Sequence, residues 1–318
     1  MPSSNASGEN SAPANESRSA SSAGPRAGEP SGEGAASQPA TRLDPGLYIV
    51  ATPIGNLGDV TLRALETLRS VDAIACEDTR VTAKLLSAYG ITRPTLSYHD
   101  HNAARRRPEI VRRIQAGEAV ALVSDAGTPL VSDPGYKLVR SLHEEGLHVS
   151  ALPGASAALT ALVLSGLPSD RFFFQGFLPS KRKARRDALA EVAGLQATLV
   201  FYESAQRLAS SLADMAAVLG PREAVVAREL TKRFEELRRG RLDTLAESYD
   251  QPPRGEIVVV VAPPAPVEAP AEEELDARIE EALTQMSLRD AVGAVSAETG
   301  VAKKTVYARA LALKEGPE

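Results

Sequence analysis

Proton-accepting side chains cluster in three short polar segments of the chain, EDTR, YHDHN and RELTK. Carboxylates and imidazoles can serve as general bases, while a neighbouring arginine or lysine can hold a phosphate or lower the pKa of a reacting hydroxyl. The candidate bases are Glu77, Asp78, His99, Asp100 and Glu229, and the candidate cations are Arg80 and Lys232. A helix cap or an ion pair is the commoner role for any one of these carboxylates, and Asp78 could cap a helix running to Tyr89. The sequence therefore leaves the choice of base open.

A glycine- and proline-containing loop at residues 124–135, SDAGTPLVSDPG, is a candidate ligand-binding surface. It follows an apolar, strand-like run at residues 119–123. Gly127 has no side chain to keep a ligand away from the main chain, and Asp133 followed by Pro134 predicts the N-cap and first residue of the next helix. Two other segments, residues 47–59 (LYIVATPIGNLGD) and 149–157 (VSALPGASA), repeat this order of strand, turn and helix.

Strand-like and helix-like runs alternate along the chain, which predicts an α/β fold. The first half contains strand-like runs at residues 47–51, 73–76, 119–123 and 148–152, and the second half contains them at 172–176, 198–202, 224–229 and 256–262. Leu62, Leu65 and Leu68 recur at helical spacing, and Gly90, Gly117 and Gly146 stand where helices should stop. We expect a mostly parallel first sheet covered on both faces, followed by a second α/β unit. Ligands of such sheets collect at the carboxyl ends of the strands.

Composition divides the chain into five parts. We expect a disordered extension at residues 1–42, because Ser, Gly, Ala, Pro and Glu dominate it and large apolar residues are nearly absent. The remaining parts are a first α/β domain at 43–167, a second at 168–262, a proline-rich linker at 263–271 and a helical segment at 272–318. Two short amphipathic helices within residues 288–311 give this last segment a helix-turn-helix-like pattern.

Charge and cysteine content narrow the functional classes. The formal net charge of −5 argues against a protein whose whole surface binds nucleic acid, although cations cluster at residues 105–113, 181–186 and 232–241. Each cluster taken alone is more often a solvated helix face than a phosphate site.

The single cysteine, Cys76, ends an apolar run and is expected to be a buried thiol. With no signal peptide and no bilayer-spanning run, we expect a soluble cytoplasmic protein.

The loop motifs, together with EDTR and YHDHN, resemble those of the tetrapyrrole methylase superfamily, whose enzymes use S-adenosylmethionine (SAM). The likeness runs from about residue 43 to the C-terminus, and five motifs in the same order with similar spacing are specific. The first turn, TPIGN, lacks the G-x-G-x-G-D start of the porphyrin-modifying members and is similar to the RNA-modifying branch. That branch methylates the ribose 2′-hydroxyl of a cytidine in small-subunit (16S) ribosomal RNA.

The resemblance implies a set of cofactor contacts on this chain. Matched position by position, they fall on Ile54, Ala126, Gly127, Thr128, Val131, Ser156, Ala157, Glu203 and Leu230, with Asp125 as a supplementary contact to the cofactor's amine or sulfonium. Ser156 stands at a helix start, where free N–H groups suit a carboxylate. A ribose hydroxyl is a weak acid that needs a base nearby, and Glu77, Asp78 and Asp100 are our catalytic candidates from the residues themselves, since the resemblance does not supply the base.

The resemblance also implies partners. The partner would be ribosomal RNA or the assembling 30S subunit, and the helical tail would help to hold the RNA. From their charge and position in the sequence, we expect Arg80, Lys181, Arg182, Lys183 and Lys232 to contact it. Superfamily members commonly form homodimers. Methylation of a tetrapyrrole, such as a corrin or sirohaem precursor, is the alternative. A ribosome-binding or nucleic-acid-binding protein with an inactive α/β body is a third hypothesis, which tight SAM binding would exclude.

Two residue groups have competing interpretations. His99 and His101 could ligate zinc from one strand face, but no cysteine or third histidine stands at a familiar spacing, so we expect no metal. Most aromatic residues of the second unit should lie in its core. Phe177 and Tyr202, at strand ends, are expected to face the cleft, where they could stack on bases.

Overall fold

The computed structural model describes residues 42–265 and 271–315, so residues 1–41 of the predicted disordered extension and part of the predicted linker lie outside the described residues. The first sheet is formed by β1 (Gly46–Val50), β2 (Ala73–Cys76), β3 (Thr95–Ser97), β4 (Ala119–Val123) and β5 (Val149–Leu152). Its strand order is β3-β2-β4-β1-β5, and every neighbouring pair is parallel. The predicted parallel sheet is therefore confirmed.

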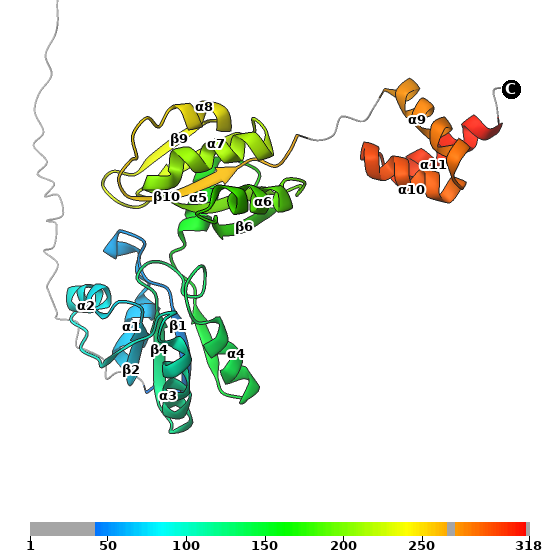
Figure 1. Ribbon diagram of the computed structural model, residues 1–318. Helices are drawn as coiled ribbons and strands as arrows, with labels where there is room; N and C mark the ends of the chain where they lie inside the picture. The colour runs from blue at the N-terminus through cyan, green and yellow to red at the C-terminus, as the bar shows by residue number, and fades with distance from the viewer. Residues whose placement is uncertain (1–41, 266–270, 316–318) are drawn as a thin grey trace, which may run out of the picture. The chain divides into compact units, whose positions relative to one another are not determined.

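Helices cover both faces of this sheet (Figure 1). Successive strand residues point to opposite faces, and because β2 and β4 are apolar throughout, both of their faces must be buried. On one face Tyr48 and Ile74 pack with residues of α1 (Leu62–Ser70) and α2 (Thr79–Ala88). On the other face Leu47 and Val120 pack with residues of α3 (Ala103–Gln115) and α4 (Tyr136–Glu144). Cys76 is fully buried, as predicted. Gly90, Gly117 and Gly146 follow the ends of α2, α3 and α4 in backbone conformations with positive φ, which confirms their predicted role.

The second sheet is mixed. It is formed by β6 (Phe172–Phe177), β7 (Thr198–Ser204), β8 (Glu223–Arg228), β9 (Glu236–Arg241) and β10 (Glu256–Val261), in the order β6-β7-β10-β8-β9. Only β6 and β7 run parallel among these pairs. Because β6 is an edge strand, Phe172 and Phe173 are 44% and 40% exposed, so the prediction that most of these aromatic residues are buried is wrong for this pair.

One face of the second sheet carries α6 (Arg182–Val192), α7 (Leu208–Leu219) and α8 (Leu242–Glu247), with Leu189, Phe201 and Leu212 in the shared core. The opposite face carries α5 (Ala157–Ser165), although this helix directly follows the last strand of the first sheet. Ile54, from the turn after β1, joins this second core beside Leu162 and Val258. The two sheets are thus connected through packed side chains. Short 3₁₀ helices, η1 (Leu57–Asp59) and η2 (Ala205–Arg207), complete the α/β body.

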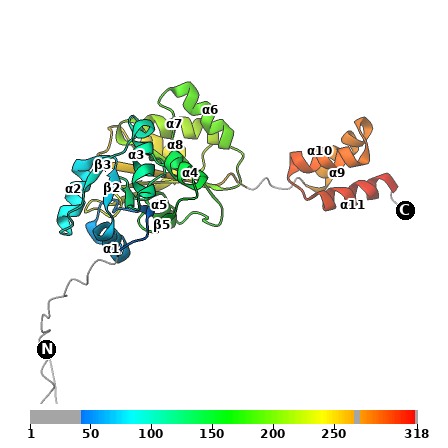
Figure 2. The same cartoon turned by 90° about the horizontal axis from the view of Figure 1, so that it is seen from below.

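Three helices form the described C-terminal segment: α9 (Glu272–Gln285), α10 (Leu288–Thr299) and α11 (Lys303–Glu315). Figure 2 shows them packed together, and Ile279, Val295 and Val306 lie in a core of their own. Gly300, in the left-handed conformation, separates α10 from α11, so the predicted helical pair is confirmed. In the described residues, no helix is both long and apolar enough to cross a bilayer.

Candidate functional site

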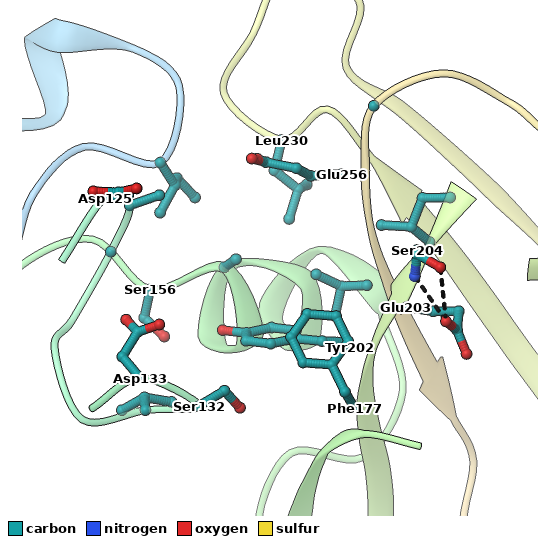
Figure 3. A pocket seen from close by; sticks show the side chains of 18 of the residues that line it. Asp125, Ser132, Asp133, Ser156, Phe177, Tyr202, Glu203, Ser204, Leu230 and Glu256 are labelled. Atoms are coloured by element: carbon teal, nitrogen blue, oxygen red, sulfur yellow. Dashed lines mark hydrogen bonds between the residues drawn. The ribbon is translucent and has the colours of Figure 1, made fainter. Parts of the chain in front are cut away.

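A cavity of about 450 Å³ lies where the loops after β1, β4 and β5 meet the second sheet. This volume falls within the range of about 300–1,000 Å³ that is usual for small-molecule sites. All ten residues to which the sequence assigned cofactor contacts line it: Ile54, Asp125, Ala126, Gly127, Thr128, Val131, Ser156, Ala157, Glu203 and Leu230. Segments separated by up to 176 positions therefore meet around one space (Figure 3).

Main-chain and side-chain hydrogen bonds hold the three loops of the first sheet together. Thr52 and Gly127 exchange two backbone bonds, N to O, of 2.9 and 3.0 Å. The hydroxyl of Thr128 donates to the carbonyl of Ala155 over 3.0 Å. These bonds fix the loop after β4 against the loops after β1 and β5, so the cavity wall is preorganised.

The loops that line the cavity contain unusual backbone conformations. Leu130 and Ser132, in the loop after β4, have φ values of +72° and +65°. Glu229 and Thr231, in the loop after β8, have φ values of +52° and +65°. In the described part of the chain these are the four non-glycine residues with positive φ. Such conformations cost about 1–3 kcal/mol each and cluster at functional sites.

The prediction that Asp133 and Pro134 begin the next helix is wrong. Helix α4 begins at Tyr136, and Gly135 occupies its N-cap position with φ of +141°. The left-handed conformations of Leu130 and Ser132 carry the loop onward before the helix starts. Asp133 lines the cavity instead, on the same loop as Asp125 and Gly127.

Burial and neighbouring charge change the acidity of Asp133. Burial first, and the carboxylate of Glu77 second, raise its pKa to about 6, while the Ser124 hydroxyl opposes the shift. Asp125 and Asp100 add to the same negative field. Burial likewise raises the pKa of Glu77, to which Asp125 and Asp100 contribute. Asp133 and Glu77 therefore hold protons more tightly than a carboxylate in water.

The carboxylate of Glu203 is held by groups of the protein itself. Its carboxylate is fully buried and accepts hydrogen bonds from the backbone N–H of Ser204 and the hydroxyl of Ser211. The guanidinium of Arg207 lies 3.3 Å from it. The bond to Ser204 is drawn in Figure 3. With its charge balanced and its oxygens occupied, Glu203 fixes the end of β7 at the cavity wall.

The catalytic candidates Glu77, Asp78 and Asp100 are not among the described residues that line the cavity. Asp78 is the N-cap of α2: it accepts the backbone N–H of Arg80 over 2.8 Å and pairs with the Arg80 guanidinium at 2.6 Å. This partner lowers the pKa of Asp78 to about 2. The capping alternative for Asp78 is thus confirmed.

The predicted RNA-contacting cations also lie outside the cavity lining of the described chain, and four of the five have acidic partners. Arg80 pairs with Asp78, Arg182 with Asp214, Lys183 with Asp187, and Lys232 with Glu229 and Glu256. Lys181 stands at the N-cap position of α6. Arg185, in the same cluster, is buried against Asp214 at 2.6 Å. Part of this basic cluster therefore serves packing.

Lys232 also connects the two sheets. A β-carbon on Gly55, in the turn after β1, would overlap Cγ of Lys232, so the lysine stem rests directly on this glycine. Its ammonium binds the carboxylates of Glu229 at 2.8 Å and Glu256 at 3.0 Å. Glu256 lines the cavity. Lys232 thereby connects the turn after β1 with Glu229, in the loop after β8, and with Glu256, at the start of β10.

Phe177 and Tyr202 line the cavity, as predicted. Their ring centroids lie 5.5 Å apart in an edge-to-face arrangement. The sequence analysis missed the lining residues Ser132, Ser204, Ala205, Gly255, Glu256, Ile257 and Val258, and missed that Asp133 is one. The residues near Glu256 reach the site because β10 pairs antiparallel with β7, an order that strand periodicity does not disclose.

His99 and His101 lie in the turn before α3, and no group of three metal-ligating side chains occurs in the described residues.

Comparison with known proteins places these features in a family. A sequence model of the tetrapyrrole (corrin/porphyrin) methylases matches residues 46–246, and one of the RsmI C-terminal HTH domain matches residues 269–314. The ribosomal RNA small subunit methyltransferase I of Mesorhizobium japonicum is 50% identical over 87% of this chain and 95% of its own length. The protein of the same name from Erythrobacter litoralis is 55% identical over 86% of this chain and 96% of its own.

Solved structures share the fold at lower identity. Diphthine synthase matches with a TM-score of 0.55 and 17% identity over 68% of this chain and 89% of its own. This likeness concerns the fold alone. The two sheets, the cavity between them, the helical tail and the curated relatives agree, and the chain belongs to the tetrapyrrole methylase family, in the group of the relatives named ribosomal RNA small subunit methyltransferase I.

Proposed function

We propose that this protein is a SAM-dependent methyltransferase that methylates the ribose 2′-hydroxyl of a cytidine in 16S ribosomal RNA. The observation that supports this most is the meeting of all ten expected cofactor positions around one cavity. The names of the curated relatives, at 50–55% identity over nearly their whole length, give the substrate class. We further propose that the protein acts in the cytoplasm as a homodimer.

The cavity residues fit the parts of SAM. Ile54 and Leu230 are buried apolar side chains that can enclose the adenine. Residues 126–128 present main chain at close range, since Gly127 carries no side chain there. Ser156 precedes the first turn of α5 and makes no capping bond of its own, so N–H groups remain for the methionyl carboxylate. Asp125 adds negative charge beside a ligand that carries an ammonium and a sulfonium.

When bound, SAM would supply an electrophilic methyl group for in-line attack by the ribose oxygen. The protein's own contribution is then alignment, exclusion of water and removal of the hydroxyl proton. The hydrogen-bonded loops keep the cavity wall rigid, and Phe177 and Tyr202 offer aromatic surface to a base that leaves its stack. RNA phosphates would be held outside the cavity, by Lys181 and Lys183 at the start of α6 and by the helical C-terminal segment.

Methylation of a tetrapyrrole is the second candidate, and two observations weigh against it. The curated relatives at 50% and 55% identity carry the ribosomal RNA name, and residues 269–314 match the C-terminal domain model of that group. A macrocycle-methylating enzyme has no use for this tail.

The experiment incubates the purified protein with SAM and 30S subunits from cells that lack it, and analyses the nucleosides of the 16S RNA. Formation of 2′-O-methylcytidine, absent when SAM is omitted, is expected. Subunits from wild-type cells are the matched control. Their cytidine is already methylated, so they should accept no methyl group. SAM binding without methylation of any RNA would support the tetrapyrrole candidate, and no SAM binding would support the inactive binding protein.

A further inference from the structure

Four carboxylates line the cavity: Asp125, Asp133, Glu203 and Glu256. Three of them have partners. Asp125 accepts the backbone N–H of Asp78 over 3.1 Å, Glu203 is bound by Arg207 and two serine groups, and Glu256 pairs with Lys232. Within the described residues Asp133 forms no ion pair. A hydrogen bond with the Ser124 hydroxyl lowers its pKa without offsetting the rise that burial causes, and no paired cation of the described chain favours the charged form of Asp133.

The backbone around Asp133 fixes where its side chain points. Leu130 and Ser132 hold left-handed conformations immediately before it, and Gly135, with φ of +141°, follows. A β-carbon on Gly135 would lie 3.0 Å from Cγ of Leu130, so the loop is closely packed. In Figure 3 the carboxylate of Asp133 and the hydroxyl of Tyr202 both point into the cavity. Strain of this kind persists only where the surrounding structure determines it.

After burial, the neighbouring charges that most affect the pKa of Asp133 are all negative. Glu77 follows β2, Asp100 precedes α3 and Asp125 lies on its own loop, and all three raise its pKa. Tyr202 faces it from β7; burial raises the pKa of that phenol, and the charge of Asp133 adds to the rise. No lysine or arginine occurs among the described lining residues. An Asp carboxylate in this field accepts a proton more readily than one in water, yet is ionised above neutral pH.

We propose that Asp133 is the general base that removes the proton of the ribose 2′-hydroxyl. This inference rests on the proposed function. In the reaction the O–H bond breaks and its proton moves to a carboxylate oxygen of Asp133, while the 2′-oxygen forms a bond with the methyl carbon. The carbon–sulfur bond breaks and its electron pair stays on the sulfur. After the methyl ether leaves, the protonated Asp133 loses its proton to water.

The test replaces Asp133 with asparagine, which keeps the shape and removes the basic oxygen. With 30S subunits as substrate, Asp133→Asn should lower kcat by about 100- to 10,000-fold, while calorimetry gives an unchanged SAM affinity. Asp133→Glu should restore part of the rate. The matched control Asp170→Asn changes an exposed aspartate outside the cavity lining of the described chain and should keep full activity. A kcat near that of the wild type in Asp133→Asn would overturn the proposal. A loss of SAM affinity with kcat unchanged would also overturn it, because Asp133 would then be a cofactor contact.

The pH dependence separates Asp133 from Glu77, the carboxylate whose charge most raises its pKa. The kcat of the wild type should fall with decreasing pH through an apparent pKa near 6. Glu77→Gln removes that charge, so the same limb should move to lower pH. If Glu77 is the base, its substitution abolishes the rate at every pH, and the proposal is refuted.

A measurement without substrate gives a second readout. Carbon-13 NMR of the side-chain carboxyls should show one resonance that titrates near pH 6 in the free protein and is missing from Asp133→Asn. A resonance that titrates at the ordinary aspartate pKa would contradict the environment that the proposal needs. If the wild type methylates no RNA, the proposed function fails; if it does and Asp133→Asn is equally active, the inference about Asp133 alone fails.

Discussion

A β-carbon placed on Gly127 would lie 3.2 Å from Cγ2 of Ile54, and the φ of Gly127 is +80°. This contact joins the loop after β4 to the turn after β1, at a point where both line the cavity. Any side chain at position 127 therefore meets both a neighbour and an unfavourable backbone conformation. Glycine here serves the packing of the loops as well as the approach of a ligand.

Gly127→Ala should lower the free energy of unfolding by about 1–2 kcal/mol, because an L-residue pays that amount in the left-handed region. Chemical denaturation measures the change. The control is Gly194→Ala, where the added β-carbon would meet nothing within 4 Å, and its effect should stay within about 0.5 kcal/mol. Equal stabilities of the two variants would contradict the strain argument. A valine at position 127 would test folding as much as cofactor binding.

Ala126→Leu tests the cavity with less effect on the fold. Ala126 lines the cavity, is exposed and has no positive φ, so a larger side chain there occupies ligand space without backbone strain. We expect SAM affinity to fall by about tenfold or more, equivalent to about 1.4 kcal/mol, with unfolding unchanged. Ala104→Leu, on an exposed position of α3, is the control. Calorimetry that finds equal SAM affinity in both variants would place the cofactor elsewhere.

Lys181→Gln with Lys183→Gln tests the basic cluster at the start of α6. Arg182 is left in place because it contacts Asp214, which also holds the buried Arg185. If both lysines contact phosphates of single-stranded RNA, the slope of log affinity against log salt should flatten by about 1.4, or 0.7 for each contact. SAM affinity should not change. An unaltered salt slope would remove these lysines from the RNA interface.

Deletion of residues 271–318 tests the helical tail. Its helices share a core that includes Ile279, Val295 and Val306 and is separate from the cores of the two sheets, so the α/β body should stay folded. We expect SAM affinity to be kept and methylation of 30S subunits to fall steeply. Thermal unfolding of the truncated body checks its integrity. Full methylation by the truncated protein would show that the tail does not hold RNA.

Much of the fold follows from apolar periodicity. AVALV at residues 119–123 forms β4 over its full length, and all eight predicted strands exist within one or two residues of their predicted ends. Two strands escaped prediction for physical reasons. β3 has only three residues, and β9, with the sequence ELRRGR, contains one large apolar residue and exists because its backbone pairs with β8.

Tertiary packing explains what else the sequence did not disclose. α5 precedes the predicted domain boundary at residue 167, yet it packs on the second sheet, since its apolar residues extend around the helix. The cofactor positions could be located because small residues in turns leave a recognisable pattern. Asp133 could not, because the conformations that aim it into the cavity belong to Leu130 and Ser132, whose residue types give no sign of positive φ.

Under the proposed function, this chain methylates one cytidine ribose of the small ribosomal subunit. The most direct measurement maps 2′-O-methylation across 16S RNA from cells that lack the protein and from the same cells with the gene restored. We predict that one cytidine loses its 2′-O-methyl group in the deletion strain and regains it on restoration, with every other ribose unchanged. Identical methylation maps in the two strains would contradict the account.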